Sequence, residues 1–169
     1  MALRFALPLL FLPAILASPL AAQTPGPFGT WILTAVPDLT PVIETATASM
    51  NFVTRPIARA RLKKATLAFQ TIRIDRGPDD IGVQYEQRTP QRMPADGRAV
   101  EWTREDGEKM QISARMDQDD LVQHYQAADG ERTNVFHVDP RTRTMTLGVT
   151  IISPHLPAPL SFSLTYRQP

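Results

Sequence analysis

Two histidines, His124 and His137, have the side chains best suited to metal binding or proton transfer in this chain. Both stand in segments whose alternating pattern predicts β-strands, and both are expected on the outer face of neighbouring strands, one diagonal step apart. Two imidazoles can share a metal ion, but a metal site normally needs a third or fourth ligand. No carboxylate is expected beside them, so we expect surface histidines, no metal site and no cofactor.

Carboxylates cluster at Asp79-Asp80, Asp117 and Asp119-Asp120, where the flanking pattern predicts turns. Aspartate is common in turns because its side chain accepts hydrogen bonds from the local backbone. The spacing does not fit a calcium-binding loop, and the sequence contains no phosphate-binding loop, dinucleotide fingerprint or serine-nucleophile motif. These observations favour a protein that is not an enzyme.

Polar side chains also interrupt the apolar face of the predicted strands. Two interpretations are open, because an apolar concavity with a few polar groups is typical of a small-molecule pocket, whereas buried polar groups can also satisfy one another. The expected pocket lining is Tyr85, Trp102, Gln123, Tyr125, Asn134 and Phe136, with Gln87 on the same face.

Tyr85 and Gln87 would be positioned by a strand that begins at Ile81, and the other lining residues by five consecutive antiparallel strands between residues 98 and 152. Met110, Ile112, Ala114 and Met116 alternate with polar residues, which is the period of a strand with one dry and one wetted face. Alternate side chains from Ile81 to Tyr166 should therefore gather into a single water-free lining.

Turn lengths predict the register of each hairpin. A three-residue loop at 105–107 with Gly107 in the left-handed conformation places Val100 and Trp102 inside. A four-residue turn at 117–120 pairs Met116 with Leu121. Turns at 129–130 and 139–142 pair Tyr125 with Asn134, Gln123 with Phe136, and Phe136 with Met145.

The fold prediction is mainly β: an antiparallel up-and-down barrel or strongly curved sheet of about 8–9 strands. One or two helices are expected between the first and second strands, since Thr40-Pro41 is a good helix start and Pro56 should end or kink that helix near Thr54. The segment 89–97 is expected to be a loop. An open sheet wrapped around the 41–54 helix is the alternative.

The first 22 residues resemble a secretory signal, with Arg4 before an apolar stretch and Leu20-Ala21-Ala22 as a cleavage site. We therefore expect a signal peptide at 1–22, a flexible leader at 23–27, and one soluble domain at 28–169 located in the periplasm or secreted. Removal of Arg4 brings the formal charge from +1 to zero, which argues against a nucleic-acid partner.

A basic run occupies residues 55–64 and contains no acid. Contact with an anionic head group or lipid is one interpretation. The favoured one is that the cations match the helix dipole and dock against the acidic hairpins. The run comprises Arg55, Arg59, Arg61, Lys63 and Lys64.

Phe28-Gly29-Thr30-Trp31 resembles the Gly-x-Trp opening of the calycins, the superfamily of lipocalins and fatty-acid-binding proteins. A helical pair followed by an antiparallel meander is similar to the fatty-acid-binding layout. The resemblance implies that Arg167 packs across Trp31 at the end of the barrel. The Arg-x-Tyr carboxylate pair of fatty-acid-binding proteins has no match at the C-terminus, which reads Tyr166-Arg167.

The functional prediction is an exported, soluble, lipocalin-like protein that binds a small apolar or amphipathic ligand in its barrel. A non-catalytic envelope interaction or structural module is the alternative, and an isomerase or cyclase on the same barrel is the third hypothesis.

Overall fold

A computed structural model describes residues 26–169 of the chain. The predicted signal peptide and most of the predicted leader lie outside the described residues. Within that range no helix has the length and apolar character needed to cross a membrane.

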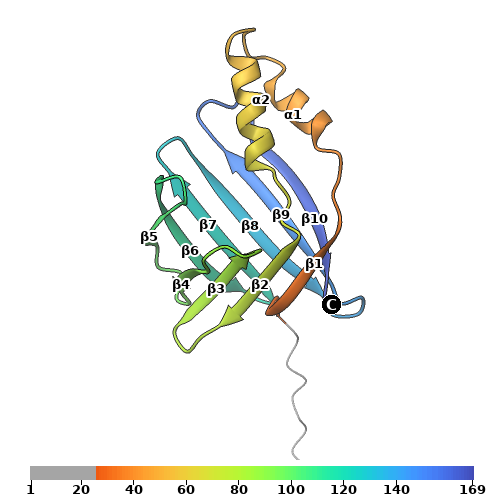
Figure 1. Ribbon diagram of the computed structural model, residues 1–169, viewed down its shortest axis with the longest axis vertical. Helices are drawn as coiled ribbons and strands as arrows, with labels where there is room; N and C mark the ends of the chain where they lie inside the picture. The colour runs from red at the N-terminus through yellow and green to blue at the C-terminus, as the bar shows by residue number, and fades with distance from the viewer. Residues whose placement is uncertain (1–25) are drawn as a thin grey trace, which may run out of the picture.

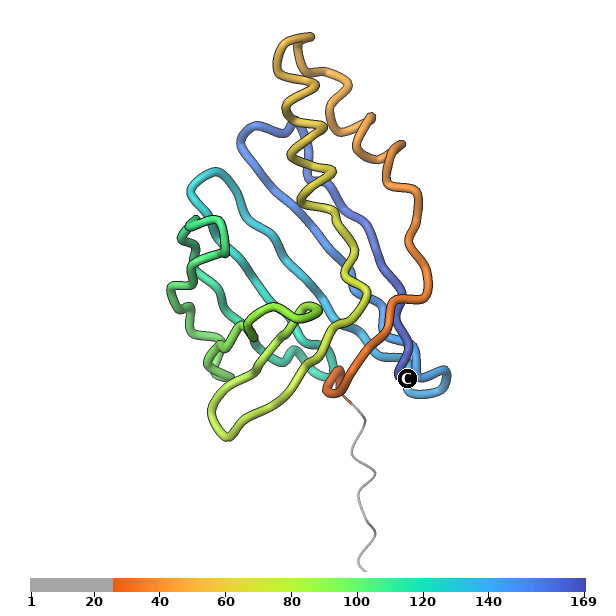
Figure 2. Tube along the Cα trace, in the orientation of Figure 1, coloured from red at the N-terminus to blue at the C-terminus, as the bar shows by residue number. Residues whose placement is uncertain are grey.

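Ten β-strands form one antiparallel sheet in which most neighbours along the chain are also neighbours in space (Figure 1). The strands are β1 (Gly29–Ala35), β2 (Thr71–Arg76), β3 (Asp80–Tyr85), β4 (Gln91–Pro94), β5 (Val100–Thr103), β6 (Lys109–Asp117), β7 (Asp120–Ala127), β8 (Gly130–Asp139), β9 (Thr144–Ile152) and β10 (Leu160–Arg167). β1 pairs with β10, so the first and last described strands lie side by side (Figure 2).

The sheet curls into a nearly closed barrel whose two edges are β4 and β5. Beyond the end of β4, an isolated bridge between Asp96 and Arg115 brings this edge to β6. The prediction of about 8–9 strands was too low, because β4 lies in the segment expected to be a loop. Pro94 is tolerated there because β4 is an edge strand that pairs only with β3, and a residue without a backbone N–H costs no ladder hydrogen bond on the unpaired flank.

The hairpin registers were predicted in part. Trp102 pairs with Met110 across a turn in which Gly107 has φ +87°, and Met116 pairs with Leu121, as expected. The next two hairpins are shifted by two residues, so that Gln123 faces Asn134 and Phe136 faces Leu147. A shift of two preserves which face each side chain occupies.

The single apolar lining is therefore confirmed despite the shifted registers. Ile112 and Leu147 are buried, and Trp102 and Tyr125 pack against the same core. Gln87 is an exception: the strand ends at Tyr85, Glu86 adopts φ +54°, and Gln87 is exposed rather than inside.

The helices α1 (Thr40–Thr47) and α2 (Thr54–Ala65) lie between β1 and β2 and stand at one end of the barrel (Figure 1). α1 ends seven residues before the predicted position near Thr54. Asn51 caps the second helix, because its Oδ1 accepts hydrogen bonds from the backbone N–H groups of Val53 and Thr54 at 3.0 and 2.9 Å. The sheet does not wrap around the 41–54 segment, so the alternative fold is wrong.

Candidate binding site inside the barrel

Five polar side chains meet inside the barrel, and we call them the interior polar cluster: Tyr85, Gln91, Gln123, Tyr125 and Asn134. They come from β3, β4, β7 and β8, at positions whose parity points inward. Gln123 and Asn134 are almost fully buried and are directly opposite each other on the neighbouring strands β7 and β8. The barrel therefore has a polar centre surrounded by an aliphatic and aromatic core.

Gln123 is the hub of this cluster. Its Oε1 accepts hydrogen bonds from the Tyr85 hydroxyl at 2.8 Å and from Nδ2 of Asn134 at 3.2 Å. Its Nε2 donates to Oε1 of Gln91 at 2.8 Å. Both ends of one amide are thus used, which fixes its orientation.

Tyr125 closes the cluster on the side of β4. Its hydroxyl donates to Oε1 of Gln91 at 2.6 Å and lies 3.4 Å from the hydroxyl of Tyr85. Tyr85 in turn accepts a hydrogen bond from Nδ2 of Asn134 at 3.0 Å. Within residues 26–169, every buried side-chain nitrogen and oxygen has a hydrogen-bond partner.

Both phenols stay protonated at neutral pH. Burial raises the pKa of Tyr85, and the charge of Arg132 opposes this only in part. Burial, reinforced by the neighbouring Tyr85, raises the pKa of Tyr125 well above its ordinary value. The cluster therefore offers hydrogen-bond donors and neutral acceptors, and its phenols are poor general bases near pH 7.

Arg132 extends the cluster toward the helices, and the sequence-based lining omitted it. Its Nε donates to Oδ1 of Asn134 at 2.8 Å, and its Nη1 donates to the carbonyl oxygen of Ala65 at the end of α2 at 2.9 Å. The signal that could have found it is parity, because residue 132 lies two positions before Asn134 and so shares its face.

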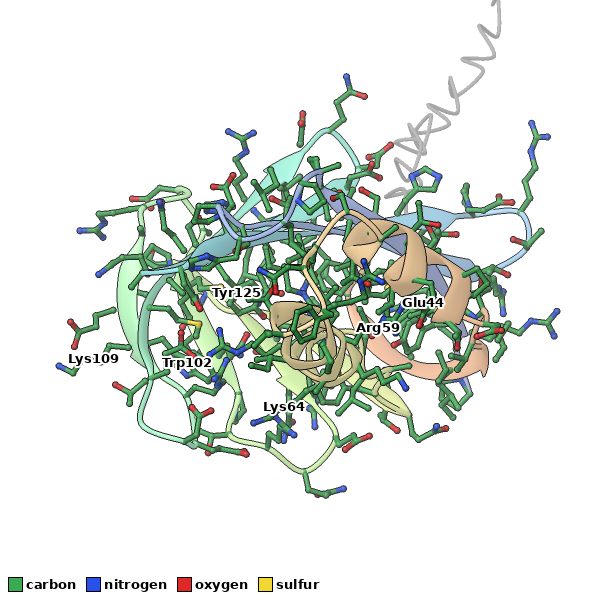
Figure 3. The ribbon with its side chains drawn as sticks, turned by 90° about the horizontal axis from the view of Figure 1, so that it is seen from above. Glu44, Arg59, Lys64, Trp102, Lys109 and Tyr125 are labelled. Carbon is green, nitrogen blue, oxygen red and sulfur yellow. The ribbon has the colours of Figure 1, made fainter. Side chains whose placement is uncertain are left out.

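The predicted lining residues do not all join the cluster. Tyr85, Gln123, Tyr125 and Asn134 do, whereas Phe136 is buried in the apolar core beside them. Trp102 is half-buried on the edge strand β5 and makes no hydrogen bond to the cluster among the described residues. Viewed from above, α2 is seen end-on over the barrel, and Tyr125 lies to one side of it within the ring of strands (Figure 3).

Two hollows are described, and both lie at the helix end of the barrel. The larger, about 380 Å³, separates α1 from the loop between β9 and β10, and is lined mainly by Pro41, Val42, Ala46, Pro157, Pro159 and Leu160. The smaller, about 240 Å³, lies beside the β7–β8 turn. Neither is lined by the interior polar cluster, which supports the interpretation that these polar groups satisfy one another.

Trp31 and Arg167 do not form the expected pair. Trp31 points inward, is buried, and donates a 2.7 Å hydrogen bond from Nε1 to the carbonyl of Pro27. Arg167 is exposed and pairs with Ile32, whose side chain points outward. The one-residue difference in register places the two side chains on opposite faces. The arginine–aromatic contacts of the described residues are Arg76 with Phe28 and Arg88 with Phe69.

The two histidines lie on the outer face with acidic partners that the sequence did not predict. His124 contacts Glu131 at 3.3 Å, and Nδ1 of His137 contacts Asp120 at 2.7 Å. Because the β7–β8 register is shifted by two, the histidines are farther apart than one diagonal step. No group of three metal-ligating side chains occurs within residues 26–169.

Three of the five helix cations bind other parts of the chain. Arg55 donates to the carbonyls of Ala48 and Met50, and Arg59 pairs with Glu44 of α1 (Figure 3). Arg61 lies 3.9 Å from Asp129 in the β7–β8 turn, which agrees with docking against an acidic hairpin. The ion pairs of the described residues do not include Lys63 or Lys64.

No family model and no curated protein matches this sequence. Among solved structures, the chain is similar to the REP1-NXSQ fatty acid transporter, with a TM-score of 0.54 and 16% identity over 84% of this chain and 95% of that one. A tyrosine-to-phenylalanine mutant of that transporter gives a TM-score of 0.52 and 16% identity over 84% and 97%. A secretary abundant heat soluble (SAHS) protein from Ramazzottius varieornatus gives 0.59 and 8% over 84% and 94%. At these identities the likeness shows the fold alone, a nearly closed antiparallel barrel with two helices between its first and second strands.

Proposed function

We propose that the chain is an exported, calycin-like binding protein that takes a small amphipathic ligand with an anionic head group, and that it performs no chemistry on it. One observation carries the proposal: an arginine, Arg132, points into the barrel mouth at the end of the interior polar cluster. The fatty acid transporter among the structural neighbours is consistent with a ligand of this class.

Within the described part of the chain, Arg132 has unused N–H donors and no ion-pair partner. A guanidinium carries five N–H donors, and the two described bonds of Arg132 go to neutral oxygens, those of Asn134 and Ala65. The ion pairs within residues 26–169 do not include Arg132. A half-buried cation without a counter-charge favours an anion, and a carboxylate can accept two N–H groups of a guanidinium at once.

The apolar hollow lies close enough to Arg132 to receive the tail of the same ligand. Arg132 pairs with Ile151 on β9, and Ile151 pairs with Leu160 on β10. Adjacent strands are about 4.8 Å apart, so Leu160, which lines the hollow, lies about 10 Å from Arg132 along one row of the sheet. A head group at Arg132 and an alkyl chain beneath α1 therefore fit one molecule.

Ligand entry requires a local exchange of hydrogen bonds. The carbonyl of Ala65 occupies one donor of Arg132, so α2 must shift or yield that bond to a head group. The interior polar cluster is already satisfied, so it positions Arg132 through Asn134 and does not have to open.

Binding of alkyl carboxylates of 10 to 16 carbons, measured by calorimetry, tests the proposal. Arg132→Gln should weaken binding about tenfold or more, since hydrogen bonds to a charged group contribute roughly 1.5–3 kcal/mol, while methyl esters should bind the two proteins alike. Arg73→Gln, which removes an exposed arginine from the outer face of β2, is the matched control and should leave the affinity unchanged. Absence of carboxylate binding by the unmodified chain would refute the proposal.

The export part of the proposal rests on the composition of residues 1–22. Expression in a bacterium with an export pathway, followed by intact-mass measurement of the envelope fraction, tests it. A protein that retains Met1 in the cytoplasm contradicts export but leaves the ligand proposal standing.

A further inference from the structure

The connection between α1 and α2 carries large apolar side chains in solvent. Phe52, Val53 and Ile57 are 86%, 58% and 56% exposed, and we call these three residues the tip patch. The connection projects at the end of the long axis of the molecule, beyond the barrel (Figure 1). Exposed apolar residues that gather at one protruding place mark an interaction surface.

The chain holds this connection in place. Arg55 donates from Nη2 to the carbonyls of Ala48 and Met50, both at 2.7 Å, and the side chain of Asn51 caps α2. These bonds satisfy the carbonyls of Ala48 and Met50 and the N–H group of Thr54. Phe52 is consequently held outward by an ordered turn.

An exposed stripe continues from the tip patch down α2. Residues 53, 57, 61 and 64 follow one another at helical spacing, so Val53 and Ile57 lead to Arg61 and Lys64 along one face. The face that Leu62 buries points the other way. The stripe is apolar at its outer end and cationic toward the barrel.

Positive charge predominates along the sequence of the tip patch and α2. After Glu44 the next acid in the sequence is Asp75, and the intervening residues include all five helix cations. Arg59 is neutralised by Glu44 and Arg61 lies 3.9 Å from Asp129, whereas the ion pairs within residues 26–169 do not include Lys63 or Lys64. An apolar end beside uncompensated cations complements the boundary between anionic head groups and acyl chains of a lipid bilayer.

We propose that the tip patch and the stripe of α2 dock the protein on the surface of an anionic lipid bilayer. Phe52, Val53 and Ile57 enter the acyl boundary, and Arg61, Lys63 and Lys64 contact head groups. The docked barrel then presents its helix end, with the hollow beside α1, toward the lipid. This inference does not require the proposed ligand, because the surface is present in the chain alone.

Vesicle binding with a position-specific readout tests the inference on the full chain. Because the N-terminal stretch Leu7 to Leu16 is itself apolar, the comparison uses variants that share it. With vesicles of four parts phosphatidylcholine to one part phosphatidylglycerol, the indole introduced by Phe52→Trp should shift its emission to the blue and be quenched by brominated acyl chains. The matched control Ile32→Trp, at an exposed apolar position on β1 that pairs with Arg167 away from the helices, should show neither effect.

Affinity measurements separate the apolar and the charged parts of the surface. Phe52→Ser combined with Ile57→Ser should lower the vesicle partition coefficient at least about tenfold. Lys63→Gln combined with Lys64→Gln should lower it on the anionic vesicles about fivefold for each charge, whereas Arg141→Gln at the opposite end of the barrel should leave it unchanged.

Three outcomes would overturn the inference. These are an unquenched indole at position 52, equal partitioning of the double serine variant, and a vesicle-free dimer that the double serine variant abolishes, which would assign the patch to a second copy of this chain. Ligand binding by the double serine variant is measured in parallel and should equal that of the unmodified chain, so that a failure here is distinct from a failure of the proposed function.

Discussion

The hydroxyl of Tyr125 donates a 2.6 Å hydrogen bond to Oε1 of Gln91 across the barrel interior. Gln91 belongs to β4, one of the two edges of the sheet, and Tyr125 belongs to β7 on the far side of the seam between β4 and β5. Main-chain pairing does not join these strands, so side chains connect them. The interior polar cluster is therefore part of what closes the barrel.

Replacement of Gln123, the hub of the interior polar cluster, should lower the free energy of unfolding more than replacement of Tyr125. Gln123→Leu removes an acceptor used by Tyr85 and Asn134 and a donor used by Gln91, and should lower the free energy of unfolding by about 2–4 kcal/mol. Tyr125→Phe should cost about 1 kcal/mol, because Gln91 keeps its bond to Gln123. Urea unfolding measures both.

The control for this comparison is Gln111→Leu, at an exposed position on the outer face of β6, which should change the free energy by less than about 0.5 kcal/mol. Equal losses for Gln123→Leu and Gln111→Leu would contradict a structural role for the cluster.

Tyrosine ionisation should be suppressed in the folded protein. Burial raises the pKa of Tyr85, Tyr125 and Tyr166, and the chain contains three tyrosines. The absorbance of tyrosinate near 295 nm should therefore show no step around pH 10 in the native state and should rise only as the chain unfolds. A native-state step near pH 10 would refute the buried placement.

The same pKa shifts predict alkaline unfolding. Above pH 10 the unfolded chain releases the phenolic protons while the folded chain keeps them, so the folded state binds more protons and its stability falls as pH rises. The contribution is complete below pH 10. Each group adds a slope of up to about 1.4 kcal/mol per pH unit, and Tyr125→Phe should reduce that slope between pH 10 and 11 in urea titrations.

Gly107 should be needed for the turn between β5 and β6. It adopts φ +87° with open space at the position of an added Cβ, so Gly107→Ala strains the backbone without a clash and should cost about 1–2 kcal/mol. Gly148→Ala on β9, where the nearest atom is 3.9 Å away and φ is not in the left-handed region, should be neutral or slightly stabilising. Thermal unfolding of the two variants gives the comparison.

Packing of Leu62 should stabilise the attachment of α1 and α2 to the barrel. It is the buried hydrophobic residue of α2, and Leu62→Ala should cost about 2–4 kcal/mol. Amide hydrogen exchange should accelerate in α1 and α2 before it does in β6 to β9, and Lys63→Ala on the same helix is the control. Uniform acceleration across the sheet would show instead that the helices and barrel open together.

The lining could be predicted from the sequence because alternate residues of a strand share one face. A register error of two residues leaves each side chain on the same face. Gln123 and Asn134 were therefore placed inside even though their partners were assigned wrongly. β4 was missed because Pro94 argues against a strand until the position of that strand at an edge is known. Arg132 was not included in the predicted lining although it shares the parity of Asn134, and its donors bind Asn134 and the carbonyl of Ala65.

The seam between β4 and β5 has a mechanical consequence. Eight of the ten strands are bonded on both flanks, and the two edge strands are four residues long. Any increase in the girth of the barrel, such as swelling around a guest molecule, is therefore concentrated along this line, where few main-chain bonds resist it. Hydrogen bonds between the side chains that span the seam can rearrange, while the main-chain pairing of the other strands stays intact.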